Sequence, residues 1–310
     1  MSTRSSEKAL QETMAEIEAL GLKEHLLELE VQGYTVLPAV LSEDQVDRAK
    51  AAILRRVEKQ TNKHIDLELA TDQDYNGMQY QHYLLFDDPV FPEIVLEPKP
   101  LALMHYLLGR SCVLSSVGSH FRGPGGMPLA LHADSPSVGM TAASLVANCN
   151  YALTPYSQSA GALVVVPGSH RNNRQPTAHE NWRAGTETYN HIAVKQLPGE
   201  ELDAVDWRRP LGAMTLDLNP GDAVIWHGNL WHGGWRRDDP GVRMNLANYF
   251  CRTHMSTQER HGDDRYPEVF ERHADNPHFA RLMGAKAFNG WRDEGPDLSG
   301  AKAAPTGLYD

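Results

Sequence analysis

Hydrophobic and polar residues alternate along this chain with two different periods. Apolar residues recur at helical spacing among charged ones from residue 6 to 30, which predicts helix. Gly33-Tyr-Thr-Val-Leu-Pro38 is typical of a short strand. Ser42-Glu-Asp-Gln45 has the form of a capping box, and apolar residues at intervals of three and four follow it. A further helix is therefore expected from about 43 to 59.

The period changes to that of β-structure after Cys112. A helix over residues 99–108 precedes this change, and short apolar runs separated by turn clusters follow it. Their number and spacing predict a sandwich, barrel or jelly roll. The runs are 112–118, 128–133, 141–153, 162–166, 213–218, 223–227 and 242–250.

Two polar segments lie outside this regular pattern. Residues 60–100 are interrupted by prolines, and residues 171–212 interrupt the series of strands with many polar and aromatic side chains. Loops of this length commonly lie over a functional site. We therefore expect one domain over 1–310, with N-terminal helices and lid loops in 1–110, a β core in 111–255 and a C-terminal extension in 256–310.

Composition narrows the class of protein. The net charge is −11, and no cluster of Lys and Arg is long enough to bind a phosphate backbone, so nucleic acid is not an expected partner. The three cysteines form no C-x-x-C motif, which argues against disulfides and thiolate metal sites. The sequence shows neither a signal-type apolar segment nor a membrane span. We expect a cytoplasmic monomer or homodimer that acts on a small molecule.

His132 and Asp134 carry the chemistry that the sequence suggests first. They are two residues apart in a strand-like run, so both side chains lie on one face. An imidazole and a carboxylate are two ligands of the 2-His-1-carboxylate triad that holds non-haem Fe(II). Either His227 or His232 could supply the third. His232 is favoured because it lies where the chain is expected to turn, before two glycines that allow close approach.

Arg243 is the second unusual residue, because it interrupts an apolar strand-like run. A buried guanidinium needs a partner. A dicarboxylate co-substrate would supply one through a bidentate pair, and an internal salt bridge is the alternative.

These stretches together resemble the phytanoyl-CoA dioxygenase family of Fe(II)/2-oxoglutarate oxygenases. The resemblance spans about residues 30–250. It implies a double-stranded β-helix (jelly roll) with flanking helices, a dioxygenase activity with O₂ and 2-oxoglutarate as co-substrates, and release of succinate. It also implies that His132, Asp134 and His232 bind iron and that Arg243 binds 2-oxoglutarate. The matching stretches are Gly33–Pro38, His132–Asp134, Gly161–His170, Gly221–Gly233 and Arg243.

The chain departs from the family pattern at two places. Many relatives carry a serine two residues after the distal histidine, whereas this chain has Gly234. Asn150 stands where some relatives have tryptophan, and Asn148 shares its strand face. Buried asparagines need partners, so we expect Asn150, together with Asn148, to bind the co-substrate or substrate. A network internal to the barrel is the alternative.

The substrate itself is not determined by the sequence. Gln79, Tyr80 and His82 lie on a predicted lid and are candidate substrate contacts. Trp235 is a fourth candidate, although a tryptophan at such a position more often fills the core or the rim. The presence of Asp134 favours hydroxylation or another oxidation over halogenation, because related halogenases lack this carboxylate. A cupin-like isomerase, hydrolase or binding module on the same fold is the alternative, and it would leave Arg243 without a role. A CoA thioester is weakly disfavoured by the lack of a basic patch, although Arg122, Arg171 and Arg174 leave that option open.

Overall fold

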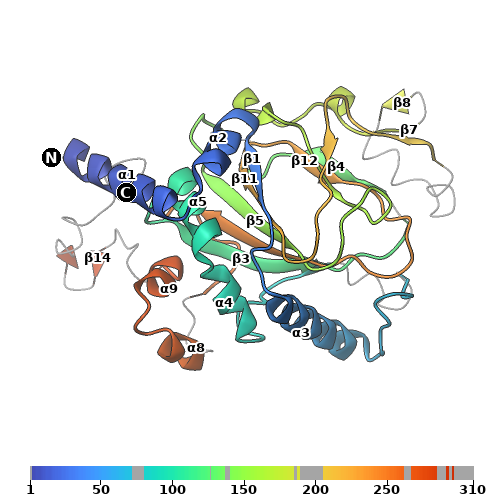
Figure 1. Cartoon of the computed structure of the whole chain (residues 1–310), viewed down its shortest axis with the longest axis horizontal. Coiled ribbons are helices and arrows are strands. Elements are labelled where there is room, and N and C mark those ends of the chain that lie inside the picture. The colour runs from blue at the N-terminus through green and yellow to red at the C-terminus, as the bar shows by residue number, and fades with distance from the viewer. Residues whose placement is uncertain are drawn as a thin grey trace.

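Two antiparallel sheets and a set of N-terminal helices form the core of the protein (Figure 1). The structure is a computed structural model. It describes residues 2–71, 80–125, 127–136, 140–184, 187–188, 205–261, 267–284, 291–292 and 295–296.

The predicted N-terminal helix is divided into α1 (Ser2–Ala19) and α2 (Lys23–Gln32). Gly21, with φ of 70°, lies between them, and a residue in this left-handed region ends a helix. Strand β1 (Tyr34–Leu37) follows. Helix α3 (Glu43–Thr61) has the predicted capping box, because Ser42 Oγ accepts from the Gln45 amide and Gln45 Oε1 accepts from the Ser42 amide.

The larger sheet has six strands in the order β1-β11-β5-β13-β3-β2. Helices α4 (Val90–Val95) and α5 (Pro98–Leu108) precede most of these strands, and α5 contacts β5, β11 and β13. The remaining strands of this sheet are β2 (Tyr80–Gln81), β3 (Val113–His120), β5 (Val146–Ala152), β11 (Ala223–His227) and β13 (Asn245–Cys251).

Strand β5 shows how this sheet separates the helical core from the site. Ala147, Cys149 and Tyr151 belong to the hydrophobic cluster that includes the helices. Asn148 and Asn150, at the alternate positions, line the cavity on the other face. Both faces are buried, which explains why the sequence here is apolar with only isolated polar positions.

The smaller sheet has four strands in the order β10-β6-β12-β4. The sequence placed a turn at His232, but this residue begins strand β12. Gly233 explains the difference, since a Cβ atom there would lie 2.5 Å from the Leu129 carbonyl oxygen, so only glycine lets β4 approach this closely. The strands are β4 (Leu129–His132), β6 (Leu163–Val165), β10 (Met214–Thr215) and β12 (His232–Gly234).

The described part of the predicted insertion contains short elements rather than a bare loop. Three of its strands form a small sheet in the order β8-β7-β9. The elements are η1 (Ser169–Asn172), η2 (Ala178–Glu180), β7 (Arg183–Ala184), β8 (Glu187–Thr188) and β9 (Trp207–Arg208).

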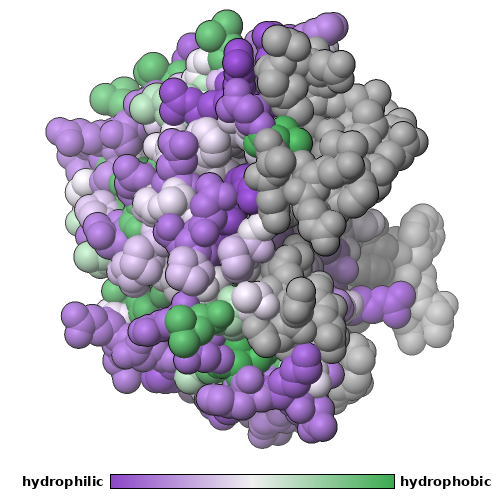
Figure 2. Space-filling view, turned by 90° about the vertical axis from the view of Figure 1, so that its right-hand side faces the viewer, coloured by the Kyte–Doolittle hydropathy of each residue, from purple (hydrophilic) through white to green (hydrophobic). Residues whose placement is uncertain are grey.

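The C-terminal part contributes α8 (Pro267–Arg272), α9 (Pro277–Leu282), β14 (Trp291–Arg292) and β15 (Gly295–Pro296). Among the coloured residues of the face shown in Figure 2, hydrophilic side chains predominate and the hydrophobic patches between them are small. Within the described residues, every helix is too short or too polar to cross a bilayer.

Candidate metal centre and its cavity

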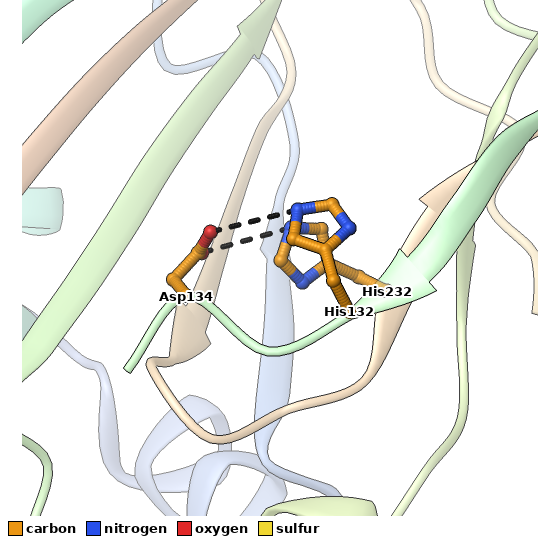
Figure 3. A group of neighbouring side chains, drawn as sticks. All are labelled: His132, Asp134 and His232. Carbon is orange, nitrogen blue, oxygen red and sulfur yellow. Dashed lines mark ion pairs between the residues drawn. The ribbon is translucent and has the colours of Figure 1, made fainter. Parts of the chain in front are cut away.

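His132, Asp134 and His232 lie together between the two sheets. His132 on β4 is paired directly with His232 on β12, and Asp134 follows β4 by two residues. One ligand atom from each residue lies within 4.8 Å of the other two. The Asp134 carboxylate faces both imidazoles, with its oxygens 3.8 Å from His132 Nε2 and 3.6 Å from His232 Nε2 (Figure 3). The structure thus brings together the three predicted ligands.

Backbone carbonyl groups set the orientation of both imidazoles. His132 Nδ1 lies 2.9 Å from the Ala130 carbonyl oxygen, and His232 Nδ1 lies 3.1 Å from that of Leu230. A carbonyl oxygen only accepts, so each Nδ1 carries a proton, and Nε2 is the ring nitrogen that can offer a lone pair to a metal. Such a hydrogen bond on the far nitrogen is the usual support of a metal-binding histidine.

Asp134 is held as a carboxylate by its neighbours. Trp226 Nε1 and Asn148 Nδ2 each donate a 2.9 Å hydrogen bond to Oδ2. Burial alone would raise the pKa of this carboxyl, but the two imidazoles and the two donors bring it below the ordinary value. Burial lowers the pKa of His232 to about 4, so its imidazole is neutral. One carboxylate and two imidazoles form a donor set suited to Fe(II).

His227, the rival of His232, lies in a different environment. Its Nδ1 accepts a hydrogen bond from the Asn229 amide, and its Nε2 lies 3.3 Å from the Ala142 carbonyl oxygen. Its ring packs against the buried His170, with 5.4 Å between centroids. Both nitrogens therefore have backbone partners, and the geometry agrees with the choice of His232.

A cavity of about 520 Å³ opens beside the three residues. Both sheets contribute to it, so it lies in the interior of the sandwich. The residues that line it are Tyr80, Ser116, His120, Leu129, His132, Asp134, Asn148, Asn150, Tyr156, Leu163, Trp226, His232, Gly233, Gly234, Arg243, Asn245, Ala247, Tyr249 and Gln258.

Arg243 lines this cavity and is buried. Its Nη1 donates to the Gly161 carbonyl oxygen, and its guanidinium lies 5.2 Å from the centre of the Tyr156 ring. Its Nε is buried and has no hydrogen-bond partner among the described residues. Among the described residues no acidic side chain forms an ion pair with Arg243, so the internal salt bridge considered from the sequence is not found there. A buried guanidinium with unused donors fits an anionic ligand.

The two asparagines of β5 differ in their contacts. Asn148 Nδ2 donates to Asp134 Oδ2, so this asparagine orients the carboxylate of the candidate metal centre. Asn150 Oδ1 accepts from Asn245 Nδ2, while Asn245 Oδ1 accepts from the His120 amide. Within the described structure the Asn150 Nδ2 group has no acceptor, and it remains a donor on the cavity wall.

The four candidate substrate contacts differ in their position relative to the cavity. Tyr80 lines the cavity, whereas the side chain of His82 is exposed and lies against Tyr80 and Tyr83. Trp235 is not among the residues that line the cavity, and its side chain packs against Trp182 in the core. Its Nε1 donates to Thr215 Oγ1. Gln79 lies outside the described residues.

His120 is a cavity residue that the sequence analysis missed. Burial lowers its pKa to about 3, and the nearby Arg243 and Arg122 add to this effect, so its imidazole is neutral. Ser116, four residues earlier on β3, also lines the cavity, because alternate residues of a strand lie on the same face. The predicted strand ended at residue 118, and extending its alternation by two residues would have found His120.

The profile of the phytanoyl-CoA dioxygenase (PhyH) family matches residues 29–244 of the chain. "Dioxygenase FrzG" of a Cladobotryum species is 28% identical over 116 residues, which are 36% of this chain and 31% of that protein. Peroxisomal phytanoyl-CoA dioxygenase of Mus musculus is 23% identical over 240 residues, 71% of this chain and 65% of that enzyme. The chain thus covers less than two thirds of the length of either relative.

Among solved structures, HygX from Streptomyces hygroscopicus with nickel and 2-oxoglutarate bound gives a TM-score of 0.54. The identity is 15%, over 76% of this chain and 88% of that one, so the likeness concerns the fold. HygX has also been solved with iron bound. The predicted family and fold are confirmed, and the predicted dioxygenase class, iron and 2-oxoglutarate agree with the family and with the groups that HygX binds.

Proposed function

Because the chain belongs to the phytanoyl-CoA dioxygenase family, we propose that it is an Fe(II)- and 2-oxoglutarate-dependent oxygenase of a small organic molecule. The observation that carries the proposal is one cavity that combines the His132, Asp134 and His232 cluster with a buried, incompletely paired Arg243. A facial triad leaves coordination positions open for a co-substrate and O₂.

The residues present fit an iron ion. His132 and His232 direct their Nε2 atoms toward the Asp134 carboxylate, and that carboxylate is oriented by hydrogen bonds to its Oδ2. These three residues would hold the metal. Bound iron would supply the activation of O₂ that is coupled to decarboxylation of 2-oxoglutarate to succinate.

Arg243 would bind the carboxylate of 2-oxoglutarate that lies away from the metal. Its guanidinium is fixed by Gly161 and Tyr156, so the charge is already in place before the co-substrate arrives. A charge-assisted pair with a carboxylate would use the Nε donor that has no other described partner. Gly234 and Asn150 border the same cavity, and Asn150 offers one further donor.

We propose hydroxylation as the outcome, since the carboxylate of Asp134 occupies the position that must be vacant for halide binding. The substrate is a small molecule rather than nucleic acid, in keeping with the net charge of −11. A cupin-like isomerase or binding protein would also explain a His/Asp metal site. It would not explain why an arginine with an unpaired Nε faces the same cavity.

Succinate formation tests this proposal. Purified protein is loaded anaerobically with Fe(II), exposed to O₂ and 2-oxoglutarate with candidate substrates, and assayed for succinate and for products heavier by one oxygen atom. Succinate should form only when iron and 2-oxoglutarate are both present. Binding of Fe(II) without any binding or turnover of 2-oxoglutarate would instead favour the cupin-like alternative.

A further inference from the structure

Tyr80 lies across Gly118 at the edge of the larger sheet. Strand β2 pairs with β3 so that Tyr80 is opposite His120, and their rings are 4.9 Å apart. A Cβ atom at Gly118 would lie 2.4 Å from the Tyr80 hydroxyl oxygen and 2.8 Å from Cζ. The end of the phenol therefore occupies the space that any other side chain at 118 would fill. Glycine at this position lets the Tyr80 hydroxyl reach the cavity.

Polar side chains flank this contact along the strand. Ser116 and His120 lie two residues before and after Gly118, on the face that lines the cavity. Ser116 Oγ donates a 2.6 Å hydrogen bond to Gln258 Oε1, which leaves the Gln258 NH₂ group as a donor. The His120 imidazole makes no hydrogen bond to a described residue. We name Tyr80, Ser116, His120 and Gln258 the polar wall.

The rest of the cavity offers little charge for a substrate. Of the described lining residues, Arg243 is the only Lys or Arg and Asp134 the only carboxylate, and both have roles in the proposed function. The three arginines considered for a CoA phosphate are engaged elsewhere. Arg122 donates to the Met127 carbonyl oxygen. Arg174 makes two 2.8 Å hydrogen bonds to Glu180, and Arg171 donates to the Glu30 carbonyl oxygen.

The polar wall disfavours an acyl chain. Methylene groups packed against it would displace water from hydroxyl, amide and imidazole groups without replacing their hydrogen bonds. Each polar group left unsatisfied costs roughly 1–3 kcal/mol. A substrate with its own hydroxyl, carbonyl or amide groups avoids this cost, and a site with such donors rejects analogues that lack the matching groups.

We propose that the polar wall is the substrate-recognition surface, and that it selects a neutral molecule rich in hydroxyl, carbonyl or amide groups rather than an acyl-CoA thioester. Tyr80 is its specificity-determining residue, placed by Gly118. This inference rests on the proposed function, because the substrate must lie beside the metal centre.

The test compares two compound sets on the Fe(II)-loaded enzyme with 2-oxoglutarate. One set holds neutral sugars, polyhydroxylated aromatics and cyclic dipeptides, and the other holds straight- and branched-chain acyl-CoA thioesters. Stimulation of succinate formation above the rate without substrate is measured for each compound. The variants are Tyr80→Phe, which removes only the hydroxyl, and Gly118→Ala, which displaces the phenol. Tyr106→Phe is the matched control, because its hydroxyl bonds Glu30 on the surface.

We expect stimulation by members of the neutral set only. For those compounds Tyr80→Phe and Gly118→Ala should each lower kcat/KM by about tenfold, roughly the contribution of one hydrogen bond to a bound substrate. The 2-oxoglutarate titration should stay unchanged in both variants, and Tyr106→Phe should match wild type. Stimulation by acyl-CoA thioesters, no stimulation by any neutral compound, or a Tyr80→Phe variant equal to wild type would each overturn the inference. Failure of the proposed function would give a different result from failure of this inference. In that case the Fe(II)-loaded wild-type enzyme would not bind 2-oxoglutarate.

Discussion

Asn148 and Trp226 are direct cross-strand neighbours, and both donate a hydrogen bond to the same oxygen of Asp134. Asn148 is on β5 and Trp226 on β11, in the larger sheet, whereas His132 and His232 are on the smaller sheet. The cluster is therefore assembled across the sandwich. Packing of one sheet on the other sets the geometry of this cluster. We therefore expect the residues that support Asp134 to contribute to metal affinity as well as the proposed ligands.

Replacement of Asn148 by Ala, or of Trp226 by Phe, should weaken metal binding about 10–100-fold, which is typical for loss of a hydrogen bond behind a metal ligand. The carboxylate would keep its place in the chain but lose a donor that orients Oδ2. Anaerobic titration with Fe(II), and with Co(II) as a spectroscopic probe, measures the change. The exposed Asn219→Ala is the matched control. Affinities equal to wild type would show that these contacts do not support the metal.

Arg243→Lys should raise the 2-oxoglutarate concentration needed for half-maximal succinate formation. Lysine keeps the charge but loses the planar fork that matches a carboxylate. Arg243→Ala should cost roughly 2–5 kcal/mol of co-substrate binding, because the carboxylate would be buried without a partner. The measurement is a 2-oxoglutarate titration of succinate release. Two variants that titrate like wild type would mean that Arg243 only stabilises the fold through Gly161 and Tyr156.

Two residues of the candidate metal centre could be predicted from the sequence because their pattern is local. His132 and Asp134 lie on one strand face because they are two residues apart. In the same way, the capping box of Ser42 marks the start of helix α3 in the sequence. The strands of the core were placed for the same reason, since alternation is a property of neighbouring positions.

The neighbours of the ligands could not be predicted, because they depend on register between distant strands. Asn148 reaches Asp134 only through the packing of two sheets, and Tyr80 finds its place over Gly118 only through the pairing of β2 with β3. A one-residue slip would turn each side chain to the other face, and no local pattern fixes that register.

Glu16→Gln should change the pH dependence of stability. A hydrogen bond from His105 is the main cause that lowers the pKa of Glu16 from 4.5 to about 2, and Arg110 contributes. A carboxylate with a lowered pKa stabilises the fold above its unfolded-state pKa, and this contribution is lost as the pH falls from about 4.5 to about 2. The variant should lose roughly 2 kcal/mol of unfolding free energy near neutral pH, and less near pH 3. Urea unfolding at both pH values measures this, with the exposed Glu7→Gln on the same helix as control. An equal loss at both pH values would contradict it.

Gly234→Ser should tighten 2-oxoglutarate binding. A Cβ atom at Gly234 would meet its nearest neighbours at 3.6 Å and Arg243 Nη1 at 3.8 Å, which are ordinary contacts, so a serine fits beside the guanidinium. Its hydroxyl would add a donor where many relatives of the family carry one, and one such hydrogen bond is worth roughly 0.5–1.5 kcal/mol, or about two- to tenfold in affinity. Gly234→Ala, which adds the Cβ without the hydroxyl, should titrate like wild type.

Gly233→Ala should instead lower the melting temperature, because its Cβ would lie 2.5 Å from the Leu129 carbonyl oxygen. Titration of anaerobic Fe(II)-loaded protein with 2-oxoglutarate compares the variants, and a serine variant that binds no more tightly than the alanine variant would show that the position is not within reach of the co-substrate.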